Sequence, residues 1–280
     1  MERRVRVVFG HFGLICVIAM LILTACDTTN SSNSSASASS GQSTLDKVLS
    51  SKVLRVGVIL GAPPFGQMDA NNNFVGYDPD VVGLLASDLK ATVKMTVLPT
   101  SPARITALAA GDVDIVAADF TMTPVRAETV SFTVPYAQES VVLVGHQGDG
   151  IRTYADLAGR KVGIVTGTTQ EILTQLAPKA VFVRFTTDPA MRQAFISGQI
   201  EAHLGDSGVA AAEVKASPDQ HFEIKQTIQQ DMISLGVRRG DIEWLNWVNG
   251  ALTYHGLHGD LQALYLKWFN EPMPKVLPSF

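Results

Sequence analysis

The sequence contains very little cysteine. Of its 280 residues only Cys16 and Cys26 are cysteines, and both lie at the N-terminus. Disulfide bonds and cysteine ligands are therefore excluded from the rest of the chain. The histidines are scattered, with no helical pair beside a glutamate, so no metal site and no cofactor are predicted. His255 and His258 stand three residues apart, and we interpret them as a hydrated surface pair.

A surplus of positive charge is also missing. The chain has 22 Lys and Arg against 26 Asp and Glu, so its formal net charge is −4 and no nucleic-acid partner is indicated. The segment "VTGTTQEI" (165–172) lacks the glycine pair and the lysine of a nucleotide-binding P-loop.

The N-terminus has the pattern of a secretory signal. Three arginines, the last of them Arg6, precede the apolar run "FGLICVIAMLIL". This run is shorter than the roughly 20 residues that a membrane-spanning helix needs. It ends in "LTAC", which resembles a lipobox. The resemblance implies that residues 1–25 are a lipoprotein signal peptide and that Cys26 carries the lipid, including palmitate. An ordinary signal peptide and an uncleaved anchor are the alternatives.

Residues 26–43 are expected to be a Ser-rich tether. Beyond Cys26 this stretch has two alanines as its only apolar residues, so it cannot bury a core. The protein is then expected in the cell envelope, anchored at Cys26 and facing the periplasm or the cell exterior. Asp27 resembles a signal that retains lipoproteins in the inner membrane, although in a host with one membrane it carries no such message.

Short strands rich in β-branched residues alternate with helical stretches from residue 53 onward. This alternation predicts an α/β fold built from β-α-β units around mainly parallel sheets. The first set comprises strands at 53–59, 92–98 and 113–119 and helices at 79–90 and 102–110.

A second set with the same architecture begins after Leu157, without a detectable sequence repeat. It comprises strands at 161–166, 181–185 and 201–206 and helices at 169–177, 189–198 and 207–217. Two extended runs, 140–147 and 232–238, flank this set, and helices at 241–256 and 260–270 close the chain. We therefore expect two lobes, residues 44–142 plus 237–280 and residues 143–236, joined by two extended hinge crossings.

Polar side chains follow three of these strands, at the edge of an open α/β sheet where ligands bind. In "AADFTMTPVRAETVSF" (117–132), Thr123 is expected to cap a short helix that Pro124 opens. Arg126 then lies in the first turn, where the helix dipole disfavours a cation. With the hydroxyl of Thr121 nearby, its guanidinium can clamp a carboxylate or a phosphate. A surface arginine beside a capped helix is the alternative.

The other two junctions are Gly167 to Thr169 and Asp206. Thr168 and Thr169 head a helix and offer hydroxyls and backbone N–H groups to the same anion. Asp206 begins the next helix, and a carboxylate opposite Arg126 holds an ammonium group. A carboxylate and an ammonium on one carbon define an α-amino acid. Plain helix capping by Thr168 and by Asp206 is the competing interpretation of both junctions.

Four segments carry a resemblance to a known family. They are "GYDPDVVGLLASDL", "RITALAAGDVDIVAADFTMTPVRAETVSFTVPY", "LAGRKVGIVTGTTQE" and "IEAHLGDSGVA". In this order and spacing they resemble the polar amino-acid-binding proteins of bacterial ABC importers, from about residue 44 to the end. The resemblance implies the type II periplasmic binding protein fold, delivery of a captured amino acid to a membrane permease, and a monomer.

The resemblance also implies roles for individual residues. Arg126 would grip the ligand's α-carboxylate, helped by Thr121 and Thr169, while Asp206 and the carbonyl of Asp119 would take its α-ammonium. Phe65 in "GAPPFG" matches an aromatic wall over the ligand, although a phenylalanine after two prolines also fits a core position.

The identity of the ligand is less well defined by these residues. Arg104 occupies a position that meets a side-chain carboxylate in relatives that bind acidic amino acids, and similar arginines occur in relatives for cysteine-like ligands. Asp119 adds negative charge, or the two side chains pair with each other. Ser101 stands where relatives for basic amino acids place an aromatic residue. A small polar or acidic amino acid is the expected ligand.

Two rival functions follow from the same residues. The segment "STLDKVLSSKVLRVG" also resembles the start of periplasmic cyclohexadienyl dehydratases, but their general acid is replaced here by Val209, so we expect no enzyme. A ligand sensor that signals to a partner protein is the second alternative, and these residues do not separate it from an importer component.

Overall fold

The structure is a computed structural model that describes residues 42–274, apart from the side chains of residues 172 and 173. The expected signal peptide, Cys26 and nearly all of the expected tether lie outside the described residues. Within residues 42–274 no helix combines the length and the apolar character needed to cross a membrane.

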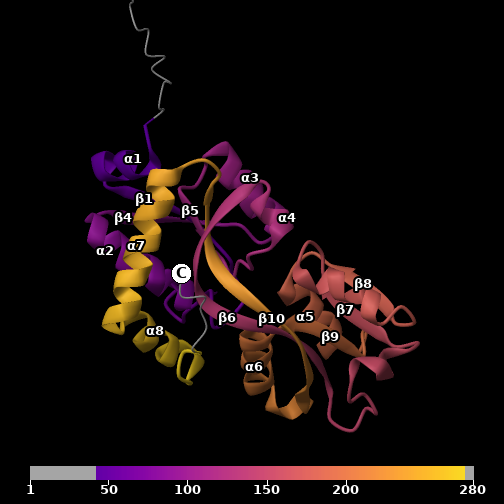
Figure 1. Cartoon of the computed structure of the whole chain (residues 1–280). Coiled ribbons are helices and arrows are strands. Elements are labelled where there is room, and N and C mark those ends of the chain that lie inside the picture. The colour runs from indigo at the N-terminus through magenta and orange to yellow at the C-terminus, as the bar shows by residue number, and fades with distance from the viewer. Residues whose placement is uncertain (1–41, 275–280) are drawn as a thin grey trace, which may run out of the picture. The chain divides into compact units, whose positions relative to one another are not determined.

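Three parallel strands form the first half of the sheet (Figure 1). The strand β1 lies between β4 and β5, and α2 and α3 provide the connections. The bounds are α1 (Thr44–Ser51), β1 (Val53–Val58), α2 (Tyr77–Leu89), β4 (Thr92–Val97), α3 (Ser101–Ala110), β5 (Ile115–Ala117) and α4 (Pro124–Ala127). A hairpin of β2 (Gln67–Met68) and β3 (Phe74–Val75) projects from this half.

The second half of the sheet repeats this arrangement with three more parallel strands. Here β7 lies between β9 and β8. The bounds are η1 (Tyr154–Leu157), β7 (Lys161–Val165), η2 (Thr169–Leu176), β8 (Val181–Phe185), α5 (Asp188–Ile196), β9 (Ala202–Asp206), α6 (Ser207–Ala216) and η3 (Pro218–Gln220).

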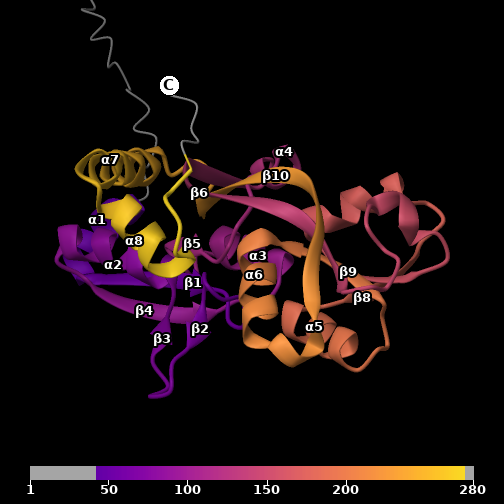
Figure 2. The ribbon, with the colours of Figure 1, turned by 90° about the horizontal axis from the view of Figure 1, so that it is seen from below.

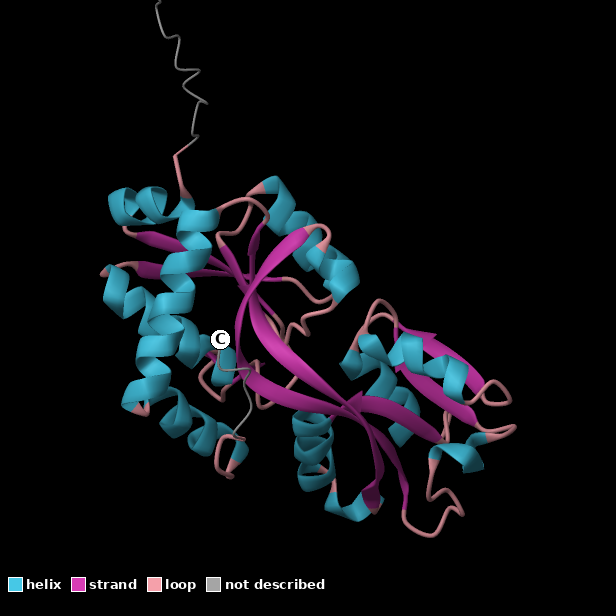
Figure 3. Ribbon diagram, in the orientation of Figure 1, coloured by secondary structure: helices cyan, strands magenta, loops and turns pink. Residues whose placement is uncertain are grey.

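Two long strands, β6 (Val130–His146) and β10 (Phe222–Arg238), join the halves. They pair with each other antiparallel over almost their whole length, and β10 pairs with β5 while β6 pairs with β9. The eight strands therefore form one continuous hydrogen-bonded sheet in the order β4-β1-β5-β10-β6-β9-β7-β8. Figure 3 shows both long strands running from one half of the sheet to the other.

The chain ends with α7 (Ile242–His258) and α8 (Asp260–Phe269). In Figures 1 and 2 these helices lie beside α1 and α2, over the first half of the sheet. The fully buried Trp244 of α7 donates its indole N–H to the carbonyl of Asp114, 2.9 Å away. The C-terminal segment therefore completes the core of the half that the chain built first.

Local sequence explains where these elements begin and end. Thr100 caps α3 by accepting a hydrogen bond from the N–H of Ala103, and Gly111 ends the helix in the left-handed conformation. The strands are rich in valine and isoleucine, which favour a pleated, buried backbone. One large apolar core covers the first half of the sheet, and two smaller cores cover the two faces of the second half.

The predicted α/β architecture is confirmed, with three differences in detail. The crossings are 17 residues each, about twice the predicted runs, because both strands extend into the two halves. Their antiparallel pairing makes the sheet mixed. The predicted helix at 169–177 is the 3-10 helix η2.

Candidate functional site: a cavity at the carboxyl ends of the strands

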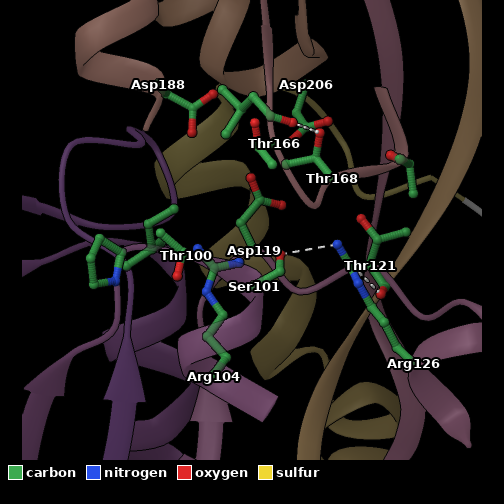
Figure 4. A pocket seen from close by; sticks show the side chains of 14 residues that line it. Thr100, Ser101, Arg104, Asp119, Thr121, Arg126, Thr166, Thr168, Asp188 and Asp206 are labelled. Carbon is green, nitrogen blue, oxygen red and sulfur yellow. Dashed lines mark hydrogen bonds between the residues drawn. The ribbon is translucent and has the colours of Figure 1, made fainter. Parts of the chain in front are cut away.

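A cavity lies where the parallel strands of both halves end (Figure 4). The empty space there is about 440 Å³, including the part that is open to solvent. Its lining consists of Ile59, Pro99, Thr100, Ser101, Arg104, Asp119, Thr121, Arg126, Val165, Thr166, Thr168, Thr169, Asp188 and Asp206. Eight of the nine site residues expected from the sequence line this cavity, and all eight have charged or hydroxyl side chains. The exception is Phe65.

Arg126 is held in place by three oxygens. Its guanidinium donates to the carbonyl of Thr121 at 2.6 Å, and to the Ser101 hydroxyl and the Gly167 carbonyl at 3.0 Å each. The Gly167 bond links the two halves of the sheet across the cavity. The ring centroid of Phe120 lies 5.0 Å from the guanidinium carbon, close enough for a cation–π contact.

The helix that carries Arg126 is organised as its sequence predicts. Thr123 accepts a hydrogen bond from the N–H of Arg126, and Pro124 is the first residue of α4. Burial lowers the pKa of Arg126 to about 10, with Arg104 adding to the effect and nearby aspartates opposing it. The guanidinium therefore remains positive at neutral pH, in a buried place that suits an anion.

Asp119 presents an unpaired oxygen to the cavity. The residue is in the left-handed conformation, with φ at 48°, and its N–H donates to the carboxylate of Asp78 at 2.8 Å. Its side chain is buried, and no described group hydrogen-bonds to its Oδ1 atom. Burial raises the pKa of Asp119 well above its usual range, and Asp206 and Glu139 raise it further. A buried oxygen in this position is prepared to accept a donor from a ligand.

Asp206 occupies the N-cap position of α6, but its side chain does not cap the helix. Burial raises the pKa of Asp206 well above its usual range, and Asp188 and Glu139 add to the effect. The N–H of Gly208, which an N-cap carboxylate would ordinarily bind, donates instead to Glu139 at 2.8 Å. The carboxylate of Asp206 is thereby left among the cavity-lining groups.

Thr168 and Thr169 both use their hydroxyl hydrogens on the protein. The hydroxyl of Thr168 donates to the Val165 carbonyl, and that of Thr169 donates to Asp231, each at 2.7 Å. Neither threonine makes a side-chain cap of η2. Both threonines line the cavity.

Arg104 is buried on the first-half side of the cavity. Its Nε donates to the Leu98 carbonyl at 3.2 Å, and its guanidinium carbon lies 5.9 Å from the Phe120 ring centroid. Among the described residues no ion pair within 4.0 Å joins it to Asp119, so the direct pairing considered in the sequence analysis is absent. Burial lowers the pKa of Arg104, while Asp119 and Asp188 oppose the effect.

Asp188 was missed by the sequence analysis. It is the first residue of α5 and lines the cavity on the second-half side, as Figure 4 shows. Burial raises its pKa, which the charge of Arg104 opposes. The signal in the sequence was its place at the junction between β8 and α5, which resembles the junction between β9 and α6 at Asp206.

Phe65 is placed elsewhere. It follows a cis Pro63–Pro64 bond, has no exposed surface, and packs against Tyr77 and Phe269 in the large core. It is not part of the cavity lining, and the core position that the sequence analysis left open is the one that the structure shows. In the described part of the chain no group of three or more metal-ligating side chains could hold a metal ion.

Comparison with known proteins identifies the class. The family model of the bacterial extracellular solute-binding proteins, family 3, matches residues 54–271, and the chain belongs to this family. Its fold is that of the type II periplasmic binding proteins.

Three proteins illustrate which members of this class the chain resembles in sequence or structure. The chain is similar to the putative ABC transporter arginine-binding protein 2 of Escherichia coli K12, at 29% identity over 79% of this chain and 93% of that protein. It is similar to the solute receptor for L-cysteine of Neisseria gonorrhoeae, with a TM-score of 0.75 and 29% identity over 84% of this chain and 97% of that one. It is also similar to the ancestral amino acid-binding protein AncCDT-1, a precursor of cyclohexadienyl dehydratase, with a TM-score of 0.76 and 32% identity over 81% and 100% of the two chains.

The raised pKa values of buried carboxyl groups predict an acid-favoured stability. Burial raises the pKa of Asp78 to about 6 and that of Glu139 to about 7. The folded protein then binds more protons than the unfolded chain, so the free energy of unfolding falls as pH rises toward 7. For Glu139 the change is about 3 kcal/mol at most. We expect the ligand-free protein to melt at a lower temperature at pH 8 than at pH 5.5.

Thermal unfolding of Glu139→Gln should show a smaller pH dependence, because the amide does not titrate. Glu243→Gln, at an exposed position on α7, is the matched control and should behave as the wild type. A melting temperature that rises steadily from pH 5.5 to pH 8 would contradict the assignment.

Proposed function

We propose that the protein captures a polar amino acid between two lobes and delivers it to an ABC permease. The observation that carries the proposal is the convergence of Arg126 and Asp206, from the two halves of the sheet, on one cavity. A guanidinium and a carboxylate on opposite sides match the two charged groups of an α-amino acid. The relatives described above are named as a putative arginine-binding protein, a solute receptor for L-cysteine and an ancestral amino acid-binding protein, which supports the same class of ligand.

The lobes of the proposal are residues 44–142 plus 237–280 and residues 143–236. The strands β6 and β10 are the only sheet segments shared by both lobes within the described residues, so bending or twisting there opens the cavity. The hydrogen bond from Arg126 to the Gly167 carbonyl is one contact made in the closed arrangement. Ligand capture is then a closure that completes the coordination of the amino acid.

In the proposed complex the α-carboxylate lies against Arg126, with Thr121 and Ser101 beside it. The α-ammonium lies between Asp206 and Asp119. It donates a hydrogen bond to Oδ1 of Asp119, which has no partner among the described residues of the ligand-free protein. Hydrogen bonds to charged groups contribute roughly 1.5 to 3 kcal/mol each, so a few of them account for micromolar affinity, which corresponds to about 8 kcal/mol.

The charges of the lining bear on the ligand's side chain. Besides Arg126 and Asp206, the cavity contains Arg104 and two carboxylates, Asp119 and Asp188. The pKa values of these carboxyls are already raised, so an acidic ligand would add charge to a site that disfavours it. The ligands expected from the sequence are small polar or acidic amino acids. Of these, we propose that the uncharged polar ones bind better than the acidic ones. Basic amino acids, which are not among the expected ligands, should also bind better than acidic ones.

The lipid anchor at Cys26 and attachment to the outer face of a membrane are part of the proposal. They rest on the "LTAC" pattern alone, and the family of extracellular solute-binding proteins supports a place outside the cytoplasm. The gene neighbourhood separates the two roles that remain. An adjacent permease and ATPase support import, whereas an adjacent receptor kinase supports sensing.

We propose that the protein is not an enzyme. The similarity to a precursor of cyclohexadienyl dehydratase makes this worth testing. Val209 stands where those enzymes are expected to carry their general acid, and its side chain packs into the large core rather than lining the cavity. Incubation with prephenate or arogenate should give no aromatic product.

Replacing Arg126 should abolish binding and leave the fold intact. Arg126→Ala removes the anion clamp, and we expect affinity to fall at least 100-fold, about 3 kcal/mol. Because burying the guanidinium is itself costly, the melting temperature of the ligand-free protein should change by only a few degrees. The measurement is a thermal-shift screen of residues 44–280 against the twenty standard amino acids and L-cystine, after unfolding and refolding.

Arg152→Ala, at an exposed arginine of the second lobe, is the matched control. A large loss of stability without ligand, together with a retained ligand response, would show that Arg126 serves the fold and not the ligand.

Replacing Asp188 should shift the preference between ligands. Asp188→Asn removes one negative charge from the cavity, so the affinity for L-glutamate should rise relative to that for L-glutamine. The exposed Asp219→Asn is the control and should leave the ratio unchanged. Calorimetric titration with both amino acids gives the ratio, and an identical ratio in wild type and Asp188→Asn would remove Asp188 from the binding site.

A further inference from the structure

Two acidic residues are neighbours at the middle of the crossing strands. Glu139 of β6 and Asp231 of β10 are paired in the strand register, and both side chains are almost fully buried. Neither residue lines the cavity. Each one instead binds a second-half segment that carries a cavity residue, because Glu139 contacts the start of α6 and Asp231 contacts Thr169 at the start of η2.

The contacts of Glu139 are those of a helix cap supplied by another strand. Its carboxylate accepts hydrogen bonds from the hydroxyl of Ser207 and, at 2.8 Å, from the N–H of Gly208. The Ser207 hydroxyl also accepts the N–H of Ser140 at 3.1 Å, which ties the start of α6 to β6 a second time. An anionic group at this place also suits the dipole of the helix.

The approach of α6 to this carboxylate is close. A Cβ atom added at Gly208 would lie 2.7 Å from Oε1 of Glu139 and 2.9 Å from the ring of Phe269. A side chain at this position would therefore displace the Glu139 carboxylate or the ring of Phe269.

We propose that Glu139 is a positioning residue for the ligand site, because it caps α6 in place of Asp206 and so leaves the Asp206 carboxylate free to bind the ligand's ammonium group. The inference rests on the proposed function. Asp206 has the extended backbone of an N-cap residue, with φ at −78° and ψ at 140°, yet makes no side-chain cap. Without Glu139, the N–H of Gly208 would attract the Asp206 carboxylate back onto its own helix.

The position also makes the site sensitive to pH. Burial raises the pKa of Glu139 to about 7, opposed by the hydrogen bonds from Ser207 and Gly208. The charged and titratable groups that face it are Asp119, Asp206, Asp231, Tyr265 and Glu271. A protonated Glu139 is a weaker acceptor, so lowering the pH from 8 to 6 should weaken its hold on α6.

The first test is the ligand-free crystal structure of Glu139→Ala. We expect the Asp206 carboxylate to turn toward the N–H of Gly208 and to leave the cavity. An Asp206 side chain that keeps its place in the cavity would overturn the proposal. Because no ligand is used, this result is independent of whether the proposed function is correct.

The second test measures stabilisation by an equimolar mixture of the twenty standard L-amino acids and L-cystine. Glu139→Ala should lose more than half of the wild-type thermal shift at pH 8, while Glu139→Gln should lose less, because its neutral amide oxygen still accepts from Gly208, although more weakly than the carboxylate. Glu243→Ala, at an exposed position on α7, should match the wild type. Equal losses in Glu139→Ala and Glu139→Gln, or no loss in either, would overturn the positioning role.

The pH profile supplies a readout that remains if Glu139→Ala fails to fold. The thermal shift of the wild type should fall between pH 8 and pH 6, and Glu139→Gln should show a smaller fall. Identical profiles would count against the proposal. If the mixture fails to shift the wild type, the proposed function fails. The ligand-free structure of Glu139→Leu, which lacks an acceptor and fills more of the space than alanine, still decides whether Asp206 depends on the hydrogen bonds of residue 139.

Discussion

The pairing of β6 with β10 is the interaction on which the rest of the structure depends. These strands connect two sets of β-α-β units that otherwise have separate cores, and they place the carboxyl ends of both sets around one cavity. Because the two strands run antiparallel, the chain leaves the first half through one and returns through the other. The terminal helices then complete the first core. The residues of the second half are therefore an insertion between two segments of the first half.

The cavity beside these strands contains buried side chains of both charges. Two arginines and three aspartates line one cavity, and burial moves the pKa values of both kinds of group toward the neutral form. Such charges are costly when unpaired, and a zwitterion supplies a partner to each sign at once. The cost of burying these charges without partners thus favours a ligand that carries both a positive and a negative group. The charged side chains that the backbone groups of the ligand do not pair then select among the ligand's side chains.

Much of this could be predicted from the sequence, because the responsible patterns are local. Strands such as Val53–Val58 and the Thr123, Pro124 and Arg126 motif depend on neighbouring residues, and both appear as predicted. Phe65 and Asp188 depend on distant partners. The ring of Phe65 is taken up by Tyr77 and Phe269, while Asp188 reaches the cavity only because β8 ends beside β7. The sequence near Glu139 contains no sign of α6, which lies almost 70 residues further on.

The glycine at position 208 has a consequence for the family. A side chain at this position would meet the Glu139 carboxylate at 2.7 Å, the ring of Phe269 at 2.9 Å and Pro64 at 3.3 Å from its Cβ atom. Loss of the acid at 139 would remove only one of these contacts, and the ring of Phe269 would still disfavour a side chain at 208. A relative without the acid is then still expected to have glycine there, whereas one that keeps the acid beside a larger residue at 208 must place the start of α6 differently.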